Sequence, residues 1–219
     1  MTANIKTILQ KNIVVILLAM MVIPSFKVEA KENKVIVIDP SGQETASKRK
    51  EPIGPGAFKS AKDTNTNEYD LNLQIALKAQ DILTEQGYTV MLTRTSNDVD
   101  ISKTDRAMIA NTMSADVFVV IDGTDNAGVS VVCQTDENPY SYGNYSDGRL
   151  LSDTILGSVV QTAGVENVGV VESDDETAIN WCSSPTAIVE IGANSENEDY
   201  QQDVAKGIAN GIESYFVQK

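Results

Sequence analysis

The chain has 219 residues, of which 42% are hydrophobic and 22% are charged, and its formal net charge at pH 7 is −14. This length suits one globular domain with a sizeable core and is too short for two large domains. The acidic balance argues against nucleic-acid binding, because a phosphate backbone demands a basic protein face. The chain contains no histidine, which excludes Ser-His-Asp and Cys-His catalysis.

The first thirty residues are predicted to be a secretory signal peptide. Lys6 and Lys11 precede a charge-free apolar run over residues 13–23, and residues 28–30, Val-Glu-Ala, have the small-residue pattern of a cleavage site. An uncleaved anchor is the second interpretation and the one expected route to a membrane, but eleven apolar residues are too few to cross a bilayer comfortably. Both interpretations place the single domain, residues 31–219, outside the cell. That domain has 14 basic and 30 acidic residues, a net charge of −16.

A buried central strand is predicted at residues 35–38, where four β-branched residues follow one another without polar alternation. This pattern is typical of a strand covered on both faces in a parallel sheet. Asp39 and Pro40 end the strand. Functional sites of open α/β sheets usually lie beyond the carboxyl ends of the central strands, so the loop that begins at Asp39 is the first candidate. The polar, Gly- and Pro-containing residues 41–67 predict that this loop is long.

Helices and strands are predicted to alternate along the rest of the chain. Four helices are predicted. The first two cover residues 68–86 (N-cap Asn67, acidic Asp70) and 103–113 (N-cap Ser102, acidic Asp105). The third has an apolar stripe from Leu151 to Thr162 and is closed by Gly164, and the last is capped by Ser195 with Glu198 and has the stripe Val204, Ile208, Ile212 and Tyr215. The further predicted strands are 88–93, 115–122, 128–135 (expected at an edge), 168–171 and 187–191. This order predicts an α/β fold, an open twisted mostly parallel sheet of about six strands with helices on both faces.

Carboxylates end three of the predicted strands, at Asp39, Asp122 and Glu190. Glu68, at the start of the first helix, would join them if the long loop folds back over this side of the sheet. One interpretation is a metal or acid–base site. The other is that aspartates at strand ends form turns and that a glutamate at a helix start complements the helix dipole, and spacing alone favours it.

Two cysteines, Cys133 and Cys182, are 49 residues apart in a chain predicted to be secreted. They would form one disulfide, or two reduced and buried thiols, and spacing does not decide between the two.

Eight segments, in colinear order from residue 34 to residue 216, carry a family resemblance. They are VIVIDPSGQ (35–43), EPIGPGA (51–57), NEYDLNLQIALK (67–78), GYTVMLTR (87–94), DRAMIAN (105–111), AINWC (178–182), AIVEIG (187–192) and KGIANGIESYF (206–216). The chain resembles the zinc-dependent N-acetylmuramoyl-L-alanine amidases of the bacterial cell wall, the AmiC-like and CwlV-like enzymes. Their reaction hydrolyses the amide between N-acetylmuramic acid and L-alanine in peptidoglycan. The resemblance implies the same fold and a peptidoglycan or muropeptide partner.

The resemblance also shows what this chain lacks. Such amidases hold zinc with a histidine in a DPGH motif, a glutamate at the start of the first helix and a second histidine at a strand end, and a last-strand glutamate is the catalytic base. The matching positions here are Gly42, Glu68, Asp122 and Glu190. The Ala-Asn pair that follows the second histidine is replaced by Gly123-Thr124. Two of the three zinc ligands are therefore missing.

No zinc cofactor is expected, because a hydrolytic zinc site needs three protein ligands and an open position for water. Asp39, Glu68, Asp122 and Glu190 would offer only oxygen ligands, a set better suited to weak Ca²⁺ or Mg²⁺ binding. Glu190 alone, as a general base, would supply a factor of about 10² to 10⁴, far below what amide hydrolysis needs.

The leading hypothesis is a secreted, zinc-free pseudoenzyme at the cell wall that binds peptidoglycan or regulates wall turnover. The alternatives are an active amidase with an altered metal site and an interaction module that docks on another cell-wall protein without touching glycan. Arg94, Arg106 and Asn111 are also kept from the family pattern, and a structural role that bridges strand and helix ends is favoured for them.

Overall fold

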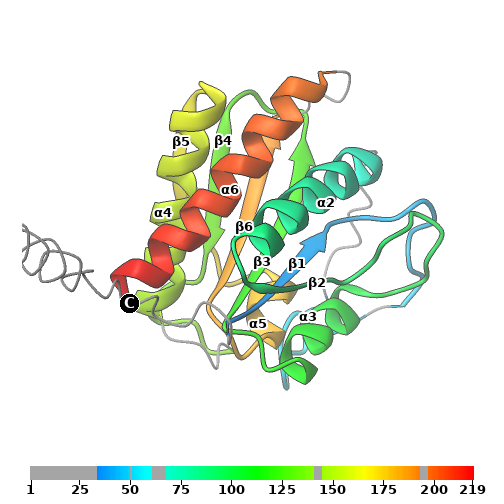
Figure 1. Ribbon diagram of the computed structural model, residues 1–219. Coiled ribbons are helices and arrows are strands. Elements are labelled where there is room, and N and C mark those ends of the chain that lie inside the picture. Colours follow the sequence, from blue (N-terminus) through cyan, green and yellow to red (C-terminus); the bar gives the residue numbers. More distant parts are fainter. Residues whose placement is uncertain (1–33, 50, 61–67, 141–144, 193–196) are drawn as a thin grey trace, which may run out of the picture. The chain divides into compact units, whose positions relative to one another are not determined.

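The computed structural model describes residues 34–49, 51–60, 68–140, 145–192 and 197–219, all within the compact unit Lys31–Lys219 (Figure 1). The predicted signal peptide lies outside the described residues and stays a prediction. Across these described ranges, no helix combines the length and the apolar character needed to span a bilayer.

Six strands form one sheet in the order β2-β1-β3-β6-β4-β5. Their bounds are Val35–Pro40 (β1), Thr89–Leu92 (β2), Val117–Thr124 (β3), Val129–Cys133 (β4), Asn167–Glu172 (β5) and Thr186–Gly192 (β6). Every neighbouring pair is parallel except β4 and β6, which are antiparallel. The predicted open, mostly parallel sheet of about six strands is confirmed. The expectation that the strand near residues 128–135 lies at an edge was wrong, because β5 pairs with its outer side.

Three long helices cover one face of the sheet and two shorter ones cover the other (Figure 1). The first group comprises α2 (Tyr69–Glu85), α4 (Tyr145–Ala163) and α6 (Glu198–Gln218), and the second comprises α3 (Lys103–Thr112) and α5 (Thr177–Trp181). The two-sided cover confirms the predicted layers. Helix α5 was not predicted, because five residues are too few to show an apolar stripe.

The capping prediction for α3 is confirmed in full. The Ser102 hydroxyl accepts a hydrogen bond from the Asp105 backbone N–H (3.1 Å), and the Asp105 carboxylate accepts one from the Ser102 N–H (3.0 Å). This capping box satisfies two N–H groups that the helix itself leaves unpaired. At the C-terminal end of α4, Gly164 closes the helix as predicted. Its φ of +64° is a left-handed conformation that suits glycine.

The other two predicted caps differ from the structure. Helix α2 has Glu68 at its N-cap, with no side-chain capping bond, and the expected cap Asn67 lies outside the described residues. Helix α6 is capped by Asn197, whose side chain accepts from the Tyr200 N–H (3.0 Å). The expectation of Ser195 as this cap was wrong, because the helix begins at Glu198 and the N-cap is the residue directly before it.

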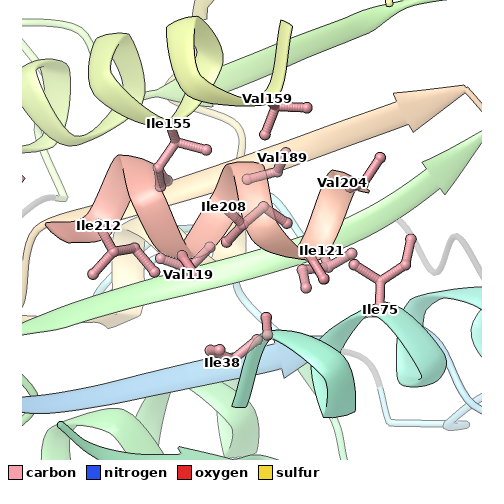
Figure 2. Packing of buried hydrophobic residues seen from close by; sticks show 14 of the residues in the cluster. Ile38, Ile75, Val119, Ile121, Ile155, Val159, Val189, Val204, Ile208 and Ile212 are labelled. Atoms are coloured by element: carbon pink, nitrogen blue, oxygen red, sulfur yellow. The ribbon is translucent and has the colours of Figure 1, made fainter. Parts of the chain in front are cut away.

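Alternate residues of the central strands enter two separate cores, because successive side chains of a strand point to opposite faces. Ile38, Val119, Ile121 and Val189 pack under α2, α4 and α6, as Figure 2 shows. Their neighbours in sequence pack under α3 and α5; among them are Val37, Phe118, Val120 and Ile188. Each fully buried side chain of this kind contributes about 1.5–3 kcal/mol. The same alternation fixes the face on which each residue at the strand ends must lie.

Helices α4 and α6 approach each other at two glycines of α6. A Cβ atom placed on Gly207 would lie 2.6 Å from the Cα of Val159, and one on Gly211 would lie closer still to the Cα of Ile155. Real Cβ atoms do not come so near to backbone, so each position admits only hydrogen. Helix α6 therefore packs at short range against α4. Its residues Ile208 and Ile212 lie between these two helices and the sheet (Figure 2).

The two cysteines are buried free thiols on opposite sides of the sheet, so the disulfide considered from the sequence is contradicted. Cys133 follows Val131 in alternation and faces α4, whereas Cys182 packs in the core under α3 and α5. A disulfide requires Cβ atoms about 4 Å apart, and the sheet separates them. Burial raises the pKa of Cys133 to about 11 and raises that of Cys182 as well, which disfavours the reactive thiolate.

Replacing Gly211 by alanine tests the close helix contact. Helix propensity alone would favour Gly211→Ala by about 1 kcal/mol, but the added methyl meets the α4 backbone, so we expect the free energy of unfolding to fall by about 1–3 kcal/mol. Gly157→Ala on the exposed side of α4 is the matched control, since its Cβ would meet no atom within 4 Å. It should leave stability unchanged or raise it. Urea unfolding measures both variants, and an equally stable Gly211→Ala protein would contradict the packing.

Candidate functional site

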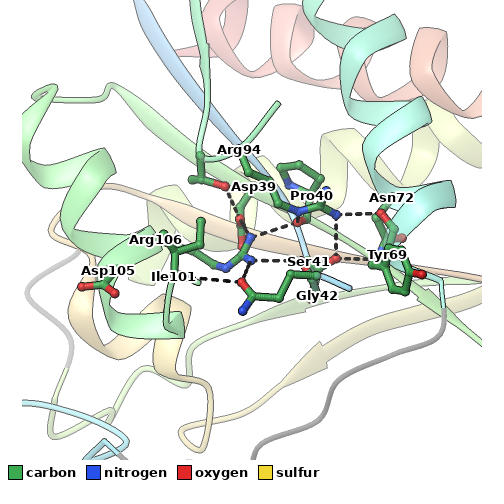
Figure 3. Close-up of polar contacts among 12 residues, drawn as sticks. Asp39, Pro40, Ser41, Gly42, Tyr69, Asn72, Arg94, Ile101, Asp105 and Arg106 are labelled. Atoms are coloured by element: carbon green, nitrogen blue, oxygen red, sulfur yellow. Dashed lines mark hydrogen bonds and ion pairs between the residues drawn. The ribbon is translucent and has the colours of Figure 1, made fainter. Parts of the chain in front are cut away.

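The loop after β1 is held by a buried ion pair. The Arg106 Nη1 donates to Asp39 Oδ1 at 2.6 Å, and the two side chains are 5% and 4% exposed. Asp39 also accepts a hydrogen bond from the Thr93 hydroxyl. A second donor of the same arginine, Nη2, reaches the backbone oxygen of Gly42 (3.0 Å) and Gln43 Oε1 (2.9 Å). Helix α3 thereby fixes the end of β1 and the turn that follows it, as Figure 3 shows.

Arg94 holds the same turn from the end of β2. Its Nε donates to the backbone oxygen of Pro40 (2.9 Å), and its Nη2 donates to those of Ser41 (3.3 Å) and Tyr69 (2.6 Å) (Figure 3). Burial and the nearby charge of Arg106 lower the pKa of Arg94 to about 10, so it stays cationic at neutral pH. These contacts join β1, β2 and the start of α2.

Asn111 links α3 to the segment after α5. Its Nδ2 donates to the backbone oxygen of Trp181 (2.8 Å), and its Oδ1 accepts from the Ser183 N–H (2.8 Å). The contacts of Arg94, Arg106 and Asn111 are thus those of bracing residues, in agreement with the structural role favoured from the sequence.

Asp39 is therefore part of the scaffold. Its carboxylate is neutralised by a buried arginine, and removing either partner of such a pair would leave the other as an uncompensated buried charge. The alternative in which Asp39 joins an all-oxygen metal site does not fit this geometry, because its Oδ1 already accepts from Arg106 and Thr93.

Asp122 and Glu190 lie side by side at the carboxyl ends of β3 and β6, where the strand register pairs them directly. Both point to the face covered by α3 and α5, in phase with Val120 and Ile188. Glu190 Oε2 accepts from the Ser130 hydroxyl at 2.6 Å. Asp122 Oδ1 is buried and accepts no hydrogen bond from the described residues. The predicted meeting of carboxylates at one end of the sheet holds for this pair.

Burial raises the pKa of Asp122 to about 6, with the charges of Glu190 and Asp39 adding to the rise. A hydrogen bond from Ser41 and the positive charge of Lys103 act in the opposite direction. The carboxyl of Asp122 is therefore only about one pH unit from its own titration at neutral pH.

Three further residues belong to the surroundings of this pair and were missed in the sequence. Lys103 and Glu176 act electrostatically on Asp122 or Glu190, and Ser130 donates to Glu190. Burial raises the pKa of Glu176. Lys103 is the first residue of α3, and Glu176 directly precedes α5. Only the packing of those helices on the sheet brings these two residues to β3 and β6. Ser130 lies within the otherwise apolar strand β4, so no sequence pattern pointed to it.

Glu68 does not join the pair. It precedes α2, which covers the opposite face of the sheet, and its side-chain stem lies against Gly123, the residue out of phase with Asp122. Within the described ranges, no three Asp, Glu or Cys side chains are grouped so that they could hold a metal ion. The four carboxylates singled out in the sequence therefore divide into one salt-bridged residue, one adjacent pair and one separate glutamate.

The residues present do not fit the zinc that the resemblance implies. Gly42 has no side chain, its φ is +73°, and its carbonyl is engaged by Arg106. Asp122 carries a carboxylate that is shorter than the imidazole at the matching family position. Zinc in hydrolases requires three converging protein ligands, and these positions supply no such set.

The fold matches those of solved N-acetylmuramoyl-L-alanine amidases. An N-acetylmuramoyl-L-alanine amidase from Clostridium difficile 630 has 27% identity and a TM-score of 0.64, over 86% of this chain and 99% of that chain. The CwlD amidase from Clostridioides difficile, solved in complex with the GerS lipoprotein, has 20% identity and a TM-score of 0.64, over 85% and 100% of the two chains.

The sequence comparison agrees with the structural one. The uncharacterized protein YqiI of Bacillus subtilis (strain 168) is 30% identical over 200 residues, which cover 87% of this chain and 88% of that protein. Residues 36–214 match the Amidase_3 family, N-acetylmuramoyl-L-alanine amidase. The chain belongs to this family of cell-wall amidases.

Removing the arginine of the buried ion pair tests its weight in the fold. Arg106→Ala leaves the Asp39 carboxylate buried with only the Thr93 hydroxyl, so we expect the free energy of unfolding to fall by about 3–5 kcal/mol. Arg149→Ala is the control, because Arg149 pairs with Asp153 and Glu172 at the surface, where such pairs contribute about 1 kcal/mol or less. Equal losses in the two variants, measured by urea unfolding, would contradict the assignment.

The raised pKa of Asp122 predicts a pH-dependent stability. Because the folded-state pKa of about 6 exceeds the ordinary 3.8, Asp122 contributes stability that is present at low pH and lost as pH rises through 6. Asp122→Asn should therefore raise the free energy of unfolding at pH 8 by about 1–3 kcal/mol, and this gain should shrink toward pH 4. Without histidine, few other side chains titrate in this range.

The measurement is urea unfolding at pH 4, 6 and 8, with Asp125→Asn as the control. Asp125 is exposed in the turn after β3, so its variant should follow the parent protein at every pH. A difference between Asp122→Asn and the parent that does not vary with pH would disprove the buried charge.

Proposed function

We propose that this protein is a secreted member of the amidase family that binds peptidoglycan at the cell wall without zinc and without hydrolysing it. The observation that carries the proposal is the state of the two positions where the family has its zinc-binding histidines. One is Gly42, whose backbone is held by Arg106, and the other is Asp122, a carboxylate paired in register with Glu190. Without a bound metal there is no activated water and no Lewis acid for the amide carbonyl.

The retained parts of the fold support wall binding. The two arginines that hold the loop after β1 are in place, and Glu190 keeps its position at the end of β6. Residues 51–60 of the long loop are also firmly attached: Trp181 Nε1 donates to the Pro52 backbone oxygen (2.9 Å), and Lys59 pairs with Asp175 (2.5 Å). A fold kept in such detail, without its catalytic ligands, favours a binding or regulatory role.

The alternative of an active enzyme with a Ca²⁺ or Mg²⁺ site is disfavoured by the same geometry, since Asp39 is neutralised by Arg106. The alternative of an interaction module has one supporting comparison, because the CwlD amidase was solved with a lipoprotein partner. Protein binding without glycan binding is therefore an outcome that the experiment must be able to reveal.

The test is co-sedimentation of residues 31–219 with purified sacculi, followed by analysis of the supernatant for released stem peptide. We expect retention above that of an unrelated protein of equal net charge, no released peptide, and no stoichiometric zinc by elemental analysis. Absence of retention would refute wall binding and leave the protein-partner alternative. Peptide release together with one tightly held zinc per chain would refute the pseudoenzyme.

Two variants locate the binding face. Phe58, in the attached loop, is fully exposed, and Val217, near the end of α6, is 78% exposed. If the sacculus contacts the loop attached beside α5, Phe58→Ala should weaken retention several-fold and Val217→Ala should not. The reverse pattern would place the contact elsewhere.

A further inference from the structure

Strand β5 forms one edge of the sheet, and within the part of the chain that the structure describes no strand pairs with its outer side. The Ser173 N–H donates to the Cys133 backbone oxygen at 2.8 Å, so every second residue from Ser173 back to Gly169 turns its backbone groups toward β4. Successive residues of a parallel strand turn these groups to alternate sides. The N–H and C=O groups of Val170 and Glu172 therefore point outward.

The side chains of β5 leave this edge accessible. Val168 and Val171 are 56% and 44% exposed, and they are two of the five large apolar side chains that are exposed among the described residues. The Glu172 carboxylate is held against α4, where it accepts from the Tyr145 hydroxyl (2.6 Å) and from Arg149 Nη1 (3.0 Å). It therefore does not fold back over the backbone groups of the edge.

Proteins commonly protect the edges of their sheets from pairing with other chains. At the opposite edge, Gln80 of α2 donates to the Val90 backbone oxygen of β2 (3.3 Å). In β5 the register with β4 skips Val168, a β-bulge before Gly169, whose φ is +117°. This bulge interrupts only the first half of the strand. The four residues from Gly169 to Glu172 stay in regular register with β4.

The carboxyl end of β5 is acidic. Thr135 donates to the Asp174 carboxylate (2.8 Å) and so joins the segments that follow β4 and β5. These segments and the strand end carry five carboxylates, at Asp136, Glu137, Glu172, Asp174 and Asp175. Only two of the five are paired with a cation, Glu172 with Arg149 and Asp175 with Lys59. A chain that pairs with this edge would therefore be attracted if it carried positive charge.

A second copy of this chain does not meet that requirement. An antiparallel pair of two β5 strands would place Glu166, before one strand, opposite the acidic end of the other strand. Like charges directly opposite each other destabilise such a pair.

We propose that the outer edge of β5, from Gly169 to Glu172, is a docking site for an extended, positively charged segment of another protein, which adds a strand to the sheet. The backbone of that segment hydrogen-bonds to Val170 and Glu172, and its apolar side chains cover Val171. Its basic side chains meet the acidic end of β5. This interaction goes beyond wall binding and does not depend on it.

Amide hydrogen exchange followed by NMR tests the proposal with a probe peptide, acetyl-Lys-Val-Lys-Val-Lys-Val-amide. In the free protein the N–H groups of Val170 and Glu172 should exchange fast and that of Val171 slowly. The peptide should slow the exchange of Val170 and Glu172 about tenfold and leave that of Val90, on the opposite edge, unchanged. A peptide with glutamate in place of each lysine should protect neither edge. No protection by the basic peptide, or equal protection by the two peptides or at the two edges, would overturn the proposal.

A pair of variants separates backbone pairing from side-chain contact. Val170→Pro removes one outward N–H, and proline is tolerated on an edge strand where its N–H would face solvent. The basic peptide should then no longer protect Glu172. Val170→Ala is the matched control, because it shortens the same side chain but keeps the N–H, and protection should persist. Undiminished protection of Glu172 in a folded Val170→Pro protein would contradict strand addition. If urea unfolding shows that this variant does not fold, the comparison of the two peptides on the parent protein decides.

Discussion

The buried ion pair between Asp39 and Arg106 is the interaction on which the arrangement of this domain's polar residues depends. It lies where the central strand ends, with both side chains almost fully buried. From that point Arg106 reaches the next turn, and Arg94 ties the turn to β2 and to the start of α2. A pair with so little solvent is costly to break. The loop that would carry a zinc ligand in the family is therefore rigid here for structural reasons.

The alternation of side chains between the two faces of the sheet has a larger consequence for function than the ion pair between Asp39 and Arg106. Asp122 and Glu190 lie on the face covered by α3 and α5, while Gly123 and Glu68 meet on the other. Glu68 and the pair of Asp122 and Glu190 therefore have different surroundings. The adjacent pair has become a partly buried acidic site with Ser130, Glu176 and Lys103 around it. The raised pKa of Asp122 follows from its burial, and the charges of Glu190 and Asp39 add to the rise.

Family membership does not by itself settle activity, because function depends on the residues of the site and not on the fold. The core, the two cover layers and the arginine network maintain the scaffold. The site depends on a few side chains whose replacement by Gly42 and Asp122 leaves that scaffold unchanged. A protein with this combination can still present the surface of an amidase to the wall, which is why binding is the function that we propose.

The sequence alone predicted the sheet, most of the helices and the α3 capping box, and it showed that the chain has no imidazole, because β-branched runs, apolar stripes and residue types are local properties. It did not determine which strand lies at the edge, the cap of α6, the separation of Cys133 from Cys182, or the seating of Glu68 on Gly123. Those features depend on which face of the sheet each residue enters and on which helix covers that face. Such pairings join residues far apart in the chain, and they are decided only when the layers pack.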